Sequence, residues 1–175
     1  MKKIFFPALL LFLLLFSCEN RTISREEEKQ TETESEETES APALSPANEL
    51  LNEWKILLAD NREITMTELG EQLIETDAFP FPGIAKKVEE GLLTGFTSEI
   101  KGFRDGALFS PMIGSIPFIG YLFRLGENDS TEAFITELKN KSDLGWNVCT
   151  RAEEKVTGAF GQVVFFVMSP LSFDE

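Results

Sequence analysis

The sequence predicts one α+β domain that follows an export signal and a polar linker. Three observations lead to this prediction. Apolar residues recur at helical spacing after residue 46, an uncharged run fills 106–123, and two β-rich segments flank a Gly-Gln turn near the end of the chain. We therefore expect N-terminal helices and a C-terminal β-hairpin in a small sheet, built by residues 46–175.

The first 17 residues have the three parts of a secretory signal. Lys2 and Lys3 precede an apolar run at 4–16, and Ser17 is a small residue immediately before Cys18. As a helix, the run would cover only about 20 Å, against about 30 Å for the hydrocarbon core of a bilayer. We expect cleavage between Ser17 and Cys18 rather than a permanent membrane span.

Leu15-Phe16-Ser17-Cys18 resembles the lipobox of bacterial lipoproteins, although Phe16 is bulkier than the usual residue there. The resemblance implies a diacylglyceryl group on the sulfur of Cys18 and usually a third chain, such as palmitate, on the new amino terminus. Stable anchoring needs about two acyl chains, so this lipid would hold the protein on a membrane. The alternative is an ordinary signal peptide whose cysteine stands there by chance.

The lipobox resemblance also bears on location. Glu19 differs from the aspartate that retains some lipoproteins at the inner membrane, which favours the cell outer membrane. The sequence leaves open whether the domain faces the periplasm or the cell surface.

Residues 18–45 are predicted to be a lipidated cysteine and a disordered acidic linker. Nine glutamates lie between residues 19 and 45, where Ile23 and Leu44 are almost the only apolar side chains. Such a segment cannot bury enough apolar surface to offset the entropy of ordering. The linker would reach at most about 90 Å at roughly 3.3 Å per residue. A binding role for the acidic run is the alternative.

The first helix is expected to begin at Ser45-Pro46, because serine is a favoured N-cap and proline suits the first helical position. It should end near Asp60-Asn61. Its apolar stripe consists of Leu50, Leu51, Trp54, Leu57 and Leu58.

A second helix is expected from a capping box at Thr65 and Glu68 through Ile74. The Phe-Pro-Phe-Pro-Gly segment at 79–83 stops it, because each proline pushes the preceding residue out of helical geometry. A short third helix is predicted from three residues at helical spacing: Ile84, Val88 and Leu92.

Residues 106–123 contain no charged side chain, but two prolines and three glycines argue against a membrane-spanning helix. The first interpretation is a buried, irregular segment with a short strand. The second is an apolar surface loop that dips into a bilayer or contacts a partner. The second interpretation requires that three side chains are exposed together: Phe118, Ile119 and Leu122.

The last part of the chain predicts a helix and a hairpin. Asp129 and Glu132 fit a second capping box, before a helix with Phe134, Ile135 and Leu138 on one face. Residues 156–160 and 163–168 then read as two strands joined by Gly161-Gln162. The second strand is apolar on both faces, which is typical of a central strand.

Residues 111–124 resemble a signature near the end of the secretin domain of outer-membrane secretion pores. The likeness lies in two prolines, two glycines and a closing Leu-Phe-Arg. It covers fourteen residues, and residues 46–105 lack the long alternating strands of a secretin barrel wall. The resemblance implies one alternative function, that of an accessory protein of a secretion channel.

Gly126-Glu127-Asn128, the helix that follows, Asn147-Val148 and the hairpin resemble the later part of the CAP family, the cysteine-rich secretory and pathogenesis-related-1 type. The resemblance implies an α-β-α sandwich with Glu127 and Asn128 at a cleft. That family uses two His and two Glu there, often around a divalent metal, but Leu144 stands in place of one His. The second alternative is therefore a degenerate CAP-like domain that holds a ligand or lipid without metal.

Charge and composition exclude several functions. The net charge is -14, so nucleic acid and anionic lipid surfaces are unfavourable partners. The chain has no histidine, which excludes Ser-His-Asp and Cys-His catalysis and removes the commonest metal ligand. With Cys18 lipidated, Cys149 is unpaired and is expected to be a small apolar core residue.

The sequence therefore predicts a non-enzymatic lipoprotein with a binding or structural domain, exported and anchored in a bacterial membrane through Cys18. The domain would bind an unknown protein or small ligand. We predict no catalytic residue, metal or cofactor.

Overall fold

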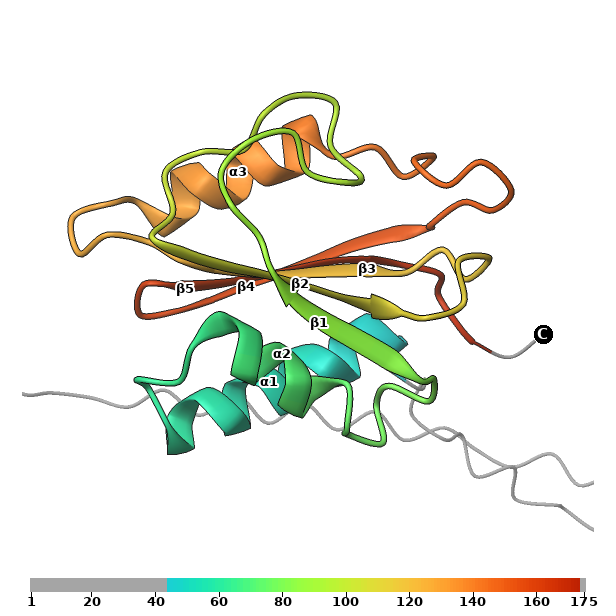
Figure 1. Ribbon diagram of the computed structural model, residues 1–175, viewed down its shortest axis with the longest axis horizontal. Coiled ribbons are helices and arrows are strands. Elements are labelled where there is room, and N and C mark those ends of the chain that lie inside the picture. The colour runs from blue at the N-terminus through green and yellow to red at the C-terminus, as the bar shows by residue number, and fades with distance from the viewer. Residues whose placement is uncertain (1–43, 174–175) are drawn as a thin grey trace, which may run out of the picture. The chain divides into compact units, whose positions relative to one another are not determined.

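The computed structural model describes residues 44–173, so the predicted signal, the lipidated Cys18 and nearly all of the linker lie outside the described residues (Figure 1). The described part is an α+β domain, as predicted, with one five-stranded sheet in the order β1-β2-β3-β5-β4. All neighbouring strands are antiparallel. The elements are α1 (Pro46–Asp60), α2 (Met66–Leu73), β1 (Gly83–Lys87), β2 (Asp105–Pro111), β3 (Ile119–Arg124), α3 (Thr131–Lys141), β4 (Glu154–Phe160) and β5 (Val163–Ser169).

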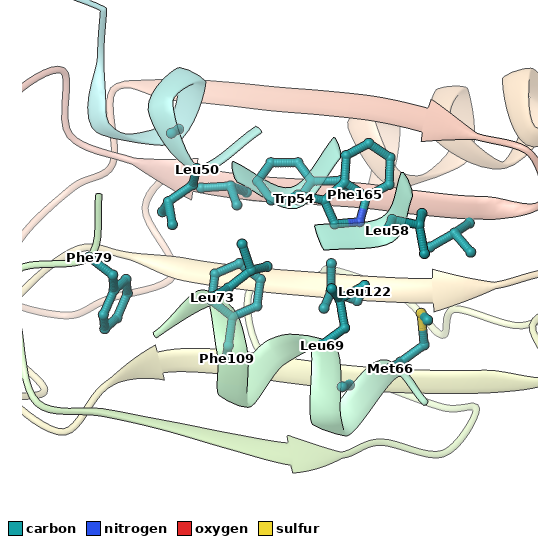
Figure 2. Close-up of a cluster of buried hydrophobic side chains, with 14 of the residues drawn as sticks. Leu50, Trp54, Leu58, Met66, Leu69, Leu73, Phe79, Phe109, Leu122 and Phe165 are labelled. Atoms are coloured by element: carbon teal, nitrogen blue, oxygen red, sulfur yellow. The ribbon is translucent and has the colours of Figure 1, made fainter. Parts of the chain in front are cut away.

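Helices α1 and α2 cover one face of the sheet (Figure 1). Ser45 is the N-cap of α1 with Pro46 next to it, and Thr65 and Glu68 form the predicted capping box of α2. Both helices turn their apolar stripes toward the strands, where they form one core (Figure 2). Its central side chains are Leu50, Trp54, Leu58, Leu69, Leu73, Phe109, Leu122 and Phe165.

Helix α3 and the long connection 88–104 cover the opposite face (Figure 1). Ser130 caps α3 by accepting a hydrogen bond from the Ala133 amide at 3.2 Å. The capping box predicted from Asp129 is wrong, because the carboxylate of Asp129 accepts from the Gly126 amide instead, at 2.8 Å. The second core contains Phe96, Tyr121, Phe123, Phe134, Val164 and Phe166.

The C-terminal hairpin forms as predicted. Gly161 adopts a φ of 57° in the turn between β4 and β5, a conformation that suits glycine. Strand β5 lies between β3 and β4, and its residues alternate between the two cores. Burial on both faces confirms that β5 is an interior strand.

The predicted third helix is wrong, because the residues after Gly83 form the edge strand β1. Gly83 pairs with Pro111 and Lys87 pairs with Ala107 in an antiparallel ladder. Three apolar residues at helical spacing are a weak signal. Pairing with β2, about twenty residues later, overrides it.

The uncharged run 106–123 contributes to two central strands, β2 and β3, rather than an irregular segment with one short strand. Phe118, Ile119 and Leu122 are buried, so the predicted exposed membrane or partner loop at these residues is wrong. Phe118 and Leu122 belong to the core under α1 and α2, and Ile119 belongs to the core under α3. Side chains on opposite faces of a sheet cannot form one exposed patch.

Candidate functional site

One end of the sheet carries very few charges. Strands β1, β3 and β4 begin there and β2 and β5 end there (Figure 1). The segments 79–83, 111–118, 147–151 and 170–173 meet at this end and contain one charged side chain, Arg151, although Glu49, Asp77 and Glu153 line the hollows beside them. We define the low-charge end as the segments 79–83, 111–118, 147–151 and 170–173.

Aromatic rings hold the C-terminal segment in the low-charge end. The ring of Phe173 lies edge-on to Phe81, with centroids 4.7 Å apart, and 6.0 Å from Phe118. Phe118 in turn contacts Phe79 at 5.3 Å. Such pairs contribute beyond the area that they bury, so segment 170–173 is part of the folded domain.

Hydrogen bonds to backbone carbonyls join the loops of the low-charge end. The side-chain amide of Asn147 donates to the Gly114 carbonyl at 2.8 Å, and the hydroxyl of Thr150 donates to the Ser115 carbonyl at 2.9 Å. The Met112 amide donates to the Pro82 carbonyl at 2.8 Å. These bonds tie the β2–β3 loop to the segment before β4 and to the approach to β1.

A groove of about 660 Å³ opens in the low-charge end. A smaller hollow of about 430 Å³ lies beside it, lined by Leu44, Glu49 and Asp77. Leu171 and Phe173 line both, so the C-terminal segment separates them. Arg151 and Glu153 are the charged residues of the groove, whose apolar lining is Phe81, Ile116, Pro117, Pro170, Leu171 and Phe173.

Exposed apolar side chains surround these two hollows. Val148 is 98% exposed and Met112 is 67% exposed. Of the eight large apolar side chains that are exposed within residues 44–173, five lie in or next to the low-charge end: Leu44, Met112, Ile113, Val148 and Leu171. A cluster of exposed apolar residues next to a groove is typical of an interaction surface.

The site residues predicted from the sequence lie away from the two hollows, or are exposed where burial was expected. Glu127 and Asn128 are exposed in the turn between β3 and α3, at the opposite end of the sheet, and line neither hollow. Cys149 is exposed, so the expected core position is wrong. It lies in a loop that hydrogen bonds hold in place, next to the fully exposed Val148.

Sequence reasoning missed most of the low-charge end. Inside the uncharged run, the turn-forming residues Gly114, Ser115 and Pro117 indicate a connection between two strands. This signal would have predicted that the neighbouring Met112 and Ile113 lie in an exposed loop. No comparable local signal marks the contacts of Phe173.

Two features were sought in the described residues, a metal-binding cluster and a membrane-spanning helix. Within residues 44–173, no group of three or more Cys, Asp or Glu side chains is arranged to hold a metal ion. In the same part of the chain, no helix combines the length and apolar character needed to cross a membrane. The arrangement at the low-charge end can exclude water and bind apolar groups.

The chain was also compared with known proteins. It matches no protein-family model, and no curated protein or solved structure is significantly similar to it.

Proposed function

We propose that this chain is a non-catalytic lipoprotein, anchored in a bacterial membrane through Cys18, whose folded domain docks on another surface. The signal-like start and the lipobox support the anchor. The observation that carries the docking role is the groove of the low-charge end with its rim of exposed apolar side chains. Glu19, the residue after the predicted lipidation site Cys18, supports the outer membrane as the location.

The chain also lacks the histidine that Ser-His-Asp and Cys-His catalysis require. With no histidine in the chain, a general base with an unperturbed pKa near neutrality is absent. The charged side chains that line the groove are Arg151 and Glu153, whose chemistry suits binding and positioning. These features favour a binding role over catalysis.

Substitution of the predicted lipidation site tests the anchor. We expect Cys18→Ala to abolish incorporation of a fatty-acid analogue and to leave the precursor uncleaved, because the thiol is the group that is acylated. Cys149→Ala is the matched control, since it removes the other cysteine of the chain and should leave labelling and cleavage unchanged. Normal labelling of the Cys18→Ala chain would disprove the anchor.

A further inference from the structure

We infer that the low-charge end lies on the bilayer that holds Cys18, with Met112, Ile113 and Val148 in the lipid interface. This inference rests on the proposed anchor and names the surface on which the domain docks. Three observations carry it: the distribution of charge, the hydrogen bonding of the loops, and the point where the linker joins the domain.

The distribution of charge favours one orientation. Residues 44–173 contain nineteen acidic and eleven basic side chains, so an anionic bilayer repels most of the surface of the domain. The four segments of the low-charge end contain one charge, that of Arg151, which can lie near lipid phosphates while its stem covers apolar surface. Three acids lie beside these segments: Glu153 lines the groove and accepts a hydrogen bond from the Leu171 amide at 3.0 Å, and Glu49 and Asp77 line the smaller hollow.

Hydrogen bonds already satisfy part of the polar backbone in the loops of the low-charge end. Polar backbone groups are costly to bury in lipid unless they have hydrogen-bond partners. The carbonyls of Gly114 and Ser115 already accept hydrogen bonds from Asn147 and Thr150. The same bonds hold the β2–β3 loop and the Val148 loop together, so their apolar side chains enter the interface as one preformed group.

The linker joins the domain at this end. Leu44, the first described residue, is exposed and lines the smaller hollow together with Leu171. The chain from Cys18 to Leu44 spans at most about 90 Å, so the lipid anchor keeps the domain close to the bilayer. Leu44, where the linker attaches, lies beside the low-charge end. The anchor therefore raises the effective concentration of lipid more at this surface than at the rest of the domain.

Cys149 provides a reporter for the test. Once Cys18 carries its thioether-linked lipid, Cys149 is the free thiol of the mature chain, and it is exposed next to Val148. We would attach a polarity-sensitive fluorophore to Cys149 in the full lipoprotein, reconstituted in vesicles of phosphatidylethanolamine with a minor fraction of phosphatidylglycerol. Docking predicts blue-shifted emission and quenching by lipids with a nitroxide near the headgroup.

Two controls separate docking from mere anchoring. With Cys149→Ser, a fluorophore on Asn128→Cys lies at the opposite end of the sheet, and we expect water-like emission without quenching by lipid. Combined replacement of Met112, Ile113 and Val148 by serine should abolish the blue shift and the quenching at Cys149. Ile56→Ser, which changes an equally exposed apolar residue on α1, should preserve both.

The remaining outcomes contradict either the docking of the domain or its anchor. If the protein floats with the vesicles but the fluorophore at Cys149 stays in water, the docking inference is wrong and the anchor stands. If the protein does not float, the proposed function is wrong as well. If the fluorophore is shielded without quenching by lipid, and shielding rises with protein density, a second copy of the chain occupies the surface instead.

Discussion

Tyr121 shows how a single side chain fixes a long connection. It is the one tyrosine of the chain, and its hydroxyl donates a hydrogen bond of 2.8 Å to the carbonyl of Thr94, in the segment that covers the α3 face of the sheet. Its ring stacks on Phe123 with centroids 5.6 Å apart. Burial raises the pKa of Tyr121, because the phenolate would lose its hydration there.

The raised pKa of Tyr121 predicts a loss of stability in alkali. A group whose pKa is higher in the folded state stabilises the fold fully below its unfolded pKa of about 10, and this contribution falls as the pH rises above that value. We expect the gap in unfolding free energy between wild type and Tyr121→Phe to narrow above pH 10. Tyrosinate absorption that appears near pH 10 in the intact fold would contradict this.

Glycine positions in the uncharged run differ in what surrounds them. A Cβ at Gly120, in β3, would overlap the ring of Phe109, whereas a Cβ at Gly114 would meet no atom within 4 Å. We expect Gly120→Ala to destabilise the fold by about 2 kcal/mol through overpacking, and Gly114→Ala to change little. Thermal unfolding of the detergent-solubilised variants measures both, and equal melting temperatures would refute the packing argument.

At the scale of elements, local signals explain what could be predicted. The stripe and proline of α1, the capping box of α2, the apolar face of α3 and the β4–β5 turn each lie within a short stretch of sequence. Strand β1 escaped prediction because its conformation depends on pairing with β2. The low-charge end could not be predicted because it is formed by four segments that are distant in the sequence. Contacts such as that of Phe81 with Phe173 leave no periodic pattern in the sequence.

Lys155 connects two elements and carries a prediction at this scale. From β4, its ammonium group donates to the carbonyls of Lys139 and Ser142 at the C-terminal end of α3, at 3.0 and 2.9 Å. Desolvation by burial lowers the pKa of Lys155, but the cation satisfies carbonyls that the helix leaves free. We expect Lys155→Met to lower the unfolding free energy by about 1 kcal/mol.

Lys139→Met is the matched control for this effect, since Lys139 is exposed on the same helix. It should change stability by less than about 0.5 kcal/mol. Denaturant unfolding measures both variants. Equal losses of unfolding free energy would show that Lys155 has no special role in stabilising the C-terminal end of α3.

At the scale of the whole domain, the sheet separates two cores and its interior strands contribute to both. The edge strand β1 carries the exposed Lys86 and Lys87, which discourage pairing with another edge. Charge is unevenly distributed over the domain, because α1, α2 and their connections are strongly acidic whereas the four segments of the low-charge end contain a single charged side chain.

The first and last described residues, Leu44 and Phe173, line the same hollow. A fluorescent protein or affinity tag fused after the last residue would therefore begin close to Leu44 and crowd the low-charge end. The exposed turn at Glu127 and Asn128 lies at the opposite end of the sheet and is the better place for such a reporter, because the neighbouring β4–β5 turn is held by hydrogen bonds of Gln162 to Gly126 and Leu125.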